Sequence, residues 1–238
     1  MSLQSLRIRN FKAVVDSKTV KLGPLTAFIG NNGAGKSSLI EALETYQAIV
    51  RDGLDAAMQR WLGIEHVRHK AQEAKERMGQ LVNPISFELA LGESPRKVRR
   101  LSMTVNNDPA SNRMFIASER VTDLAGDFTE RNVLNSMPPH GAGRSILTVP
   151  VDLGLTMVSN EVLAWQFLTL SPERMGLPVP QQRTEGGVRL ARDGSNVADF
   201  LHDLRRQDTR AFNGIVETMA FVLPYAKDIQ PTLTSSEI

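Results

Sequence analysis

The sequence predicts an α/β fold organised around a glycine-rich loop, with an antiparallel meander added after it. Three observations predict this class. A nearly all-apolar run at residues 25–29 leads directly into a glycine-rich loop at 30–37. Apolar residues then recur at helical spacing between Leu39 and Ile49. Further along, segments within 85–121 alternate apolar and polar side chains, which is typical of half-buried strands.

The first predicted elements are short strands. Residues 6–9 alternate apolar and basic side chains with the period of a half-buried strand. Residues 19–22 repeat this pattern after a polar turn at 16–18, so we expect an antiparallel pair. Pro24 interrupts the chain before the apolar run. Because nearly every residue of 25–29 is apolar, we expect this strand to be buried on both faces.

The elements after the loop change from helix to sheet. The first helix is expected to run to about Val50, and the more polar residues 51–80 are expected to form a helical insert. Residues 81–121 then predict a β meander, with a turn of Asn, Asp and Pro at 106–109.

The last part of the chain, residues 122–238, is expected to be loop-rich and helical. Residues 122–145 are rich in Gly, Pro, Asn and Ser and predict a long loop. Two amphipathic helices are expected near the end, the first capped by Ser195. The second is expected to be capped by Asp208 and to stop at Pro224.

Composition excludes several kinds of site. The 238 residues include no cysteine, which excludes disulfides, thiolate zinc sites and cysteine nucleophiles. No signal peptide or membrane-spanning run is visible, so we expect a cytoplasmic protein with no membrane partner. The net charge of +2 gives no overall basic field. Basic runs at 96–100 and 205–206 are read as solvated faces, with contact to a nucleic-acid phosphate backbone left open.

One motif carries specific chemistry. Residues 30–37, Gly-Asn-Asn-Gly-Ala-Gly-Lys-Ser, match the pattern G-x-x-x-x-G-K-[ST] at every fixed position. A triphosphate needs several converging N–H donors, and glycines let the backbone approach closely enough to supply them. The following helix adds the positive end of its dipole. We therefore expect Lys36 to reach the phosphates of ATP and the Ser37 hydroxyl to hold Mg²⁺.

Other candidate motifs are weaker. His66 and His69 have the spacing of metal ligands, but no further ligand accompanies them, and a solvated helix face is the preferred interpretation. Residues 123–126 fit the D-x-x-G pattern of GTPases, yet no guanine-reading N-K-x-D motif is present. A P-loop kinase is disfavoured because two strands are predicted ahead of the P-loop strand.

Two segments near the start of the chain carry a specific family resemblance, and residues 167–172, 190–196 and the two predicted helices ending at Pro224 resemble the middle region of the same family. Residues 6–12, with Asn10-Phe11-Lys12, and residues 28–39 resemble the opening of the RecF/SMC-like ATPases, most narrowly the bacterial AAA-type proteins related to the OLD family. The resemblance implies an ABC-ATPase-like N-terminal lobe, in which the basic residue at Lys12 approaches the nucleotide. The implied nucleotide-binding residues are Lys12, Asn31, Asn32, Gly33, Ala34, Gly35, Lys36, Ser37 and Ser38.

The resemblance also defines what is missing. Members of these families carry a Leu-Ser-Gly-Gly type signature and a Walker B strand that ends in Asp-Glu. Residues 170–173 have Pro172 where the signature needs glycine, and Pro150 argues against a central strand at 147–152. We therefore expect residues 1–238 to be the N-terminal part of one ATPase domain. A homodimer or a partner chain would supply the missing motifs, so the chain alone should bind ATP but hydrolyse it poorly.

Two functional classes follow from this expectation. In the first, ATP-dependent dimerisation is coupled to nucleic acid, as in DNA repair or phage defence. In the second, the chain is a nucleotide-binding regulatory or assembly module that controls a partner effector with little turnover of its own. DNA-stimulated ATP turnover would separate the two classes.

Overall fold

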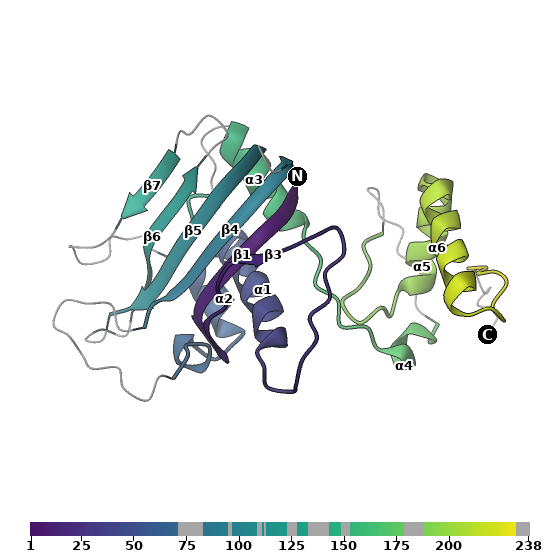
Figure 1. The fold of residues 1–238 in the computed structure, drawn as a ribbon, viewed down its shortest axis with the longest axis horizontal. Coiled ribbons are helices and arrows are strands. Elements are labelled where there is room, and N and C mark those ends of the chain that lie inside the picture. Colours follow the sequence, from purple (N-terminus) through teal and green to yellow (C-terminus); the bar gives the residue numbers. More distant parts are fainter. Residues whose placement is uncertain are drawn as a thin grey trace. The chain divides into compact units, whose positions relative to one another are not determined.

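The computed structural model divides the chain into two compact units, Met1–Trp165 and Gln166–Ile238 (Figure 1). The prediction that residues 1–238 are part of a single ATPase domain stays a prediction. The structure describes residues 1–70, 83–94, 97–108, 111, 113–122, 128–132, 143–148, 153–178 and 188–231.

The first unit is built on an antiparallel sheet with the strand order β2-β1-β4-β5-β6-β7, in which β3 also pairs with β1. The predicted strand pair at 6–9 and 19–22 is confirmed by the pairing of Leu6 with Val20. The predicted meander is also confirmed. The strands are β1 (Ser2–Phe11), β2 (Val14–Asp16), β3 (Val20–Lys21), β4 (Ile85–Ser94), β5 (Lys97–Asn107), β6 (Met114–Thr122) and β7 (Phe128–Asn132).

Strand β7 corrects the prediction of an uninterrupted loop over 122–145. It pairs with β6 from Thr122↔Phe128 to Ser118↔Asn132, so the meander extends by one strand. The sequence of β7 is short and polar, and its pairing depends on the neighbouring strand more than on its own pattern. The other residues of the predicted loop, 123–127 and 133–142, lie outside the described residues.

Helices cover one face of this sheet. Helix α1 (Lys36–Asp52) confirms the helix predicted after the loop. The insert predicted as helical over 51–80 is helical only in part, as α2 (Leu54–Gln59) and a 3₁₀ turn (Ile64–His66). Gly53 separates α1 from α2 with φ of 89°, and Gly63 precedes the 3₁₀ turn with φ of 115°; neither conformation is helical, so the helix is interrupted at both positions. Residues 71–80 lie outside the described part. Helix α3 (Leu153–Ala164), which packs against α1, was not predicted.

The two faces of the sheet differ sharply in polarity. On β4 and β5, Phe87, Leu89, Leu101 and Met103 are buried against the helices, whereas the residues between them are partly exposed. This alternation is typical of an antiparallel sheet with one covered face and one solvated face. At the centre of the core, the ring of Tyr46 lies 5.6 Å from that of Phe87 and 6.5 Å from that of Trp165, measured between centroids.

A buried carboxylate on the covered face of the sheet, that of Glu119, holds the segment at 145–146, which precedes α3, by hydrogen bonds. Glu119 of β6 is 1% exposed. It accepts hydrogen bonds from the Ser145 hydroxyl at 2.5 Å and from the Ile146 backbone N–H at 2.9 Å. Burial, and then the nearby charge of Glu119, raises the pKa of Tyr46 well above its usual value. Glu119 is therefore a structural acceptor within the core.

Replacing this acceptor should destabilise the first unit. In Glu119→Gln one carboxylate oxygen becomes an NH₂ group that cannot accept, so one of the two donors loses its partner. We expect the free energy of unfolding to fall by about 1.5 kcal/mol, measured by urea denaturation. Glu88→Gln on the exposed face of β4 is the matched control. Its ion pair with Arg9 is solvent-exposed, so its loss should lower the free energy of unfolding by less than about 1 kcal/mol. Equal losses in both variants would contradict the structural role of Glu119.

The segment before the glycine-rich loop corrects the sequence-based prediction. Residues 25–29 were expected to form a strand buried on both faces, but they form no strand, and Leu25 and Ile29 are 92% and 94% exposed. A strand is buried only when neighbouring strands flank it and other elements cover it. None of the strands in the described part of the chain pairs with 25–29.

Within residues 166–178 and 188–231, the described part of the second unit, lie the helices α4 (Pro172–Met175), α5 (Val197–Gln207) and α6 (Thr209–Val222). The cap of α6 is confirmed, since the Asp208 side chain accepts from the Ala211 N–H at 2.9 Å. The cap of α5 is not: Asn196 holds the cap position, and Ser195 lies in the preceding turn. The segment compared with the signature begins α4 at Pro172. None of the helices in the described part of the chain is both long and apolar enough to cross a membrane.

Candidate phosphate-binding site

The glycine-rich loop has the backbone conformation that its sequence predicts. Gly30, Gly33 and Gly35 all have positive φ, at 156°, 85° and 86°, a region that side-chain-bearing residues rarely adopt. The loop closes on itself through a hydrogen bond from the Ala34 N–H to the Asn31 carbonyl at 3.2 Å. The three glycines therefore permit a tight wrap that a chain of ordinary residues would resist.

Gly35 also permits a close contact with the β1–β2 hairpin. A Cβ atom at this position would lie 3.2 Å from Cγ2 of Val14, which is tighter than an ordinary van der Waals contact. The same test at Gly33 finds nothing within 4 Å. Gly35 is thus required for packing as well as for conformation, whereas Gly33 borders open space.

The start of α1 is suited to an anion. Gly35 occupies its cap position, so no side chain accepts from the first N–H groups of the helix, and the first turn contains no acidic residue. The N-terminal N–H groups of a helix have no intrahelical partner and carry a partial positive charge. A helix that begins with glycine and lacks an acidic first turn leaves this charge available to a phosphate.

Lys36 ties the two ends of the loop together. Its Nζ donates to the carbonyl oxygens of Gly30 and Asn31, at 2.8 Å each, although Lys36 itself is the first residue of α1. The ammonium group therefore lies beside the loop, over which the sequence predicts the phosphates to bind. A flexible lysine can exchange these carbonyl contacts for phosphate oxygens with little movement of the backbone.

The remaining loop residues differ in exposure. Asn31, Asn32, Ala34 and Ser37 are exposed, so the Ser37 hydroxyl is accessible to a metal ion. The Ser38 side chain is buried, with 7% exposure. Ser38 can contribute its backbone to an anion site, but its hydroxyl faces the interior.

Lys12 lies near the loop but contacts other groups. Its Nζ donates to the Glu41 carboxylate at 2.8 Å and lies 3.5 Å from the ring centroid of Trp61. Its backbone is fixed as well, with φ of 49° and a hydrogen bond from its N–H to the Val67 carbonyl at 2.6 Å. The structure thus places Lys12 beside α1, one turn beyond Lys36, with Glu41 and Trp61 as its partners.

Sequence reasoning missed these partners and the loop's packing partner. Glu41 lies on α1 five residues after Lys36, and a charge at that position has no fixed place in the loop motif. Trp61, which contacts Lys12, and Val14, which contacts Gly35, lie on other elements and are distant in sequence from the residues they contact. Only the resemblance that singled out Lys12 pointed towards this part of the molecule.

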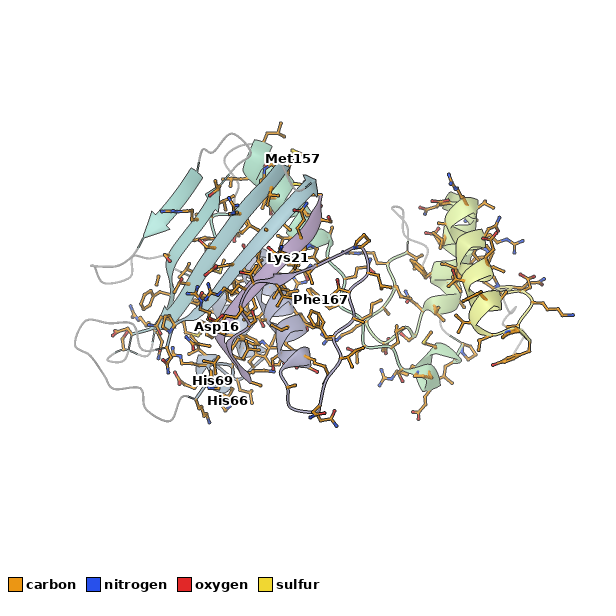
Figure 2. The ribbon with its side chains drawn as sticks, viewed as in Figure 1. Asp16, Lys21, His66, His69, Met157 and Phe167 are labelled. Carbon is orange, nitrogen blue, oxygen red and sulfur yellow. The ribbon has the colours of Figure 1, made fainter. Side chains whose placement is uncertain are left out.

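Of the two histidines considered as metal ligands, His69 contacts the backbone and His66 is exposed to solvent. His69 contacts the backbone at two points: its N–H donates to the Asn10 carbonyl at 2.9 Å, and its Nδ1 lies 2.7 Å from the Lys12 carbonyl. His66 is exposed. Figure 2 shows both side chains low on the sheet unit. Within the described ranges, no group of three or more potential metal-ligating His, Cys, Asp or Glu residues occurs. The GTPase-like segment at 123–126 is outside those ranges.

The residues present fit a nucleoside triphosphate. Positive-φ glycines, an uncapped helix start and a lysine ammonium converge on one loop, and Ser37 offers an exposed hydroxyl beside them. Bound Mg²⁺ would neutralise charge on the phosphate oxygens. The protein's own part would be to hold the phosphates with backbone N–H groups and Lys36. Water activation needs a further residue, and the segment nearest to a Walker B strand is a turn at 147–148, with 149–152 outside the described residues.

Comparison with known families agrees with this geometry. Residues 1–108 match the family model described as AAA ATPase domain. The match covers the segments at 6–12 and 28–39 and confirms the resemblance there. It does not extend to the later segments at 167–172 and 190–196, whose resemblance stays a prediction. No curated protein matches the chain. Residues 1–108 are thus similar to an AAA ATPase domain.

Proposed function

We propose that this chain is an ATP- and Mg²⁺-binding module of the RecF/SMC/OLD-like ATPases, with an ABC-ATPase-like N-terminal lobe. The observation that carries the proposal is the loop at 30–37, where Lys36 and the uncapped start of α1 face the same phosphate position. Ser37 holds the metal ion. In this proposal the chain binds the nucleotide, and hydrolysis requires residues from elsewhere.

The exposed segment before the loop supports an incomplete site. Leu25 and Ile29 expose over nine-tenths of their surface, although such side chains are normally buried in a strand that leads into a phosphate-binding loop. We infer that residues 25–29 pair with a strand from another chain. A second copy of this chain, or a partner chain, would supply that strand and would also bring the signature and Walker B groups to the nucleotide.

Binding without turnover is the direct test. Purified residues 1–238 should bind a fluorescent ATP analogue in the presence of Mg²⁺, and should release phosphate from ATP only slowly. In Ser37→Ala, Mg²⁺ should strengthen ATP binding much less than in the natural sequence. The ATP affinity measured with Mg²⁺ should fall about tenfold, because the Ser37 hydroxyl is the metal ligand that this chain supplies. Ser17→Ala, at a hydroxyl on the β2–β3 connection, is the matched control. Turnover at the rate of a complete ATPase would refute the proposed division of the site.

The biological role separates into two candidates. The expected coupling to DNA, in repair or phage defence, predicts that duplex DNA stimulates ATP turnover of the assembled protein. A regulatory or assembly module predicts ATP-dependent binding of an effector without such stimulation. The first is favoured by the arginine-bearing face of the sheet described below.

A further inference from the structure

The helix-free face of the sheet carries a concentration of basic side chains. The register aligns Arg7 with Glu88, Glu88 with Ser102, and Ser102 with Arg120 across β1, β4, β5 and β6. Because neighbouring strands lie about 4.8 Å apart, this row spans about 14 Å. A second row aligns Ser5, Ala90, Arg100 and Thr122 across the same strands. Paired residues share a face, so both rows point away from the helices.

A shallow depression lies across these rows. Its volume is about 340 Å³, and its polar lining includes Arg7, Arg100 and Arg120, the hydroxyl side chains of Ser102 and Thr122, and the Glu88 carboxylate. Arg100 and Arg120 are exposed and stand on neighbouring strands as a diagonal pair, with Cβ atoms about 7–8 Å apart. Arginines flanked by hydroxyls are the side chains that most often contact phosphate oxygens.

Two carboxylates described on this face, those of Asp16 and Glu88, are paired with cations. Arg7 forms two hydrogen bonds with Asp16, and Lys18 adds a third at 3.0 Å. These bonds, the one from Arg7 first, hold the pKa of Asp16 well below its usual value. Glu88 pairs with Arg9 at 2.7 Å. Figure 2 shows Asp16 and Lys21 at the β1 edge of the same unit, where Lys21 pairs with Ser5.

The balance of charge on this face is therefore positive. Among the side chains that the structure describes there, six cations stand against the two carboxylates of Asp16 and Glu88. The cations are Arg7, Arg9, Lys18, Lys21, Arg100 and Arg120. None of the outward side chains that the structure describes on β1, β4, β5 and β6 in the two rows is aromatic, and the register continues the second row to Phe128 of β7. The described part of the face therefore offers contacts to phosphate.

We propose that this arginine face, defined by the outward residues of β1, β3, β4, β5 and β6, binds the phosphodiester backbone of a nucleic-acid duplex. The contacts are to phosphate and carry no base specificity. The surface is distinct from the loop at 30–37 and does not require ATP. It shares with the proposed function only the expectation of a nucleic-acid partner.

The test measures binding of a labelled DNA duplex to residues 1–238 by fluorescence anisotropy at several salt concentrations. The double variant Arg100→Ser/Arg120→Ser should bind at least tenfold more weakly, and the slope of log affinity against log salt should fall by about two. Both side chains are exposed, so folding should be preserved, which a thermal melt checks. Arg113→Ser/Arg210→Ser removes the same charge from other exposed positions and should leave both quantities nearly unchanged.

A variant of opposite sign sharpens the test. Glu88→Gln removes a carboxylate from the arginine face and releases Arg9, so duplex affinity should rise by roughly fivefold at low salt. Lys36→Ala should bind the duplex as tightly as the natural sequence does, which separates this proposal from the ATP site. Equal losses in the two double variants, or no gain in Glu88→Gln, would overturn the proposal. So would binding of heparin or single-stranded DNA in preference to the duplex.

Discussion

Lys36→Ala should lower the affinity of residues 1–238 for ATP by about 100-fold, which corresponds to about 2.7 kcal/mol. The ammonium group contacts the loop backbone directly, at 2.8 Å from two of its carbonyls. A charged hydrogen-bond donor facing a phosphate contributes more than a neutral one, and its removal leaves phosphate charge uncompensated. Titration of a fluorescent ATP analogue measures the effect.

Two comparisons make this result specific. Lys21→Ala removes the same charge from an exposed position on β3 and should leave ATP affinity within a factor of two of the natural value. Thermal unfolding of Lys36→Ala should change little, because the contacts it loses are on the exposed loop. If the variant binds ATP as the natural sequence does, residues 30–37 are not the nucleotide site.

Gly35→Ala should destabilise the first unit by about 3 kcal/mol, whereas Gly33→Ala should cost about 1 kcal/mol. Both residues have φ near 85°, so the conformational penalty of a Cβ is shared. Only at Gly35 does that Cβ meet a neighbour, Cγ2 of Val14 at 3.2 Å. Since Val14 is 8% exposed and held in β2, it has little room to retreat.

Chemical denaturation of the two variants gives both values, and their difference isolates the packing contribution. The double variant Gly35→Ala/Val14→Ala provides the check, because the smaller side chain removes the atom that the new Cβ would meet. The double variant should lose less stability than the sum of the losses measured for Gly35→Ala and Val14→Ala separately. Equal destabilisation by the two glycine variants would show that the hairpin does not press on the loop.

The loop was predictable because its chemistry is local. Positive φ at Gly33 and Gly35 and the position of Lys36 at the helix start follow from fixed spacings within eight residues. The cap at Asp208 was predictable for the same reason, since a cap acts on an N–H three residues away. Adjacent Ser195 and Asn196 both suit a cap, and composition alone does not decide between them.

Features that depend on distant residues were not predictable. The apolar pattern of residues 25–29 indicates a strand that suits burial, but burial itself depends on strands that lie elsewhere. Helix α3 has apolar residues on most of its surface, so it lacks the one-sided periodicity that marks a helix from sequence. The partners of Lys12 and the buried Glu119 are defined only once β6, α1 and Trp61 are brought together.

The most direct measurement of the central claim is an NMR titration of isotope-labelled residues 1–238 with ATP and Mg²⁺, following backbone amide signals. We predict large shifts for the amides of Gly33, Gly35, Lys36 and Ser37, because their N–H groups surround the proposed phosphates. Amides of α5 and α6 should not move. The central claim is contradicted if saturating ATP leaves the loop amides unshifted, or shifts them no more than those of α5 and α6.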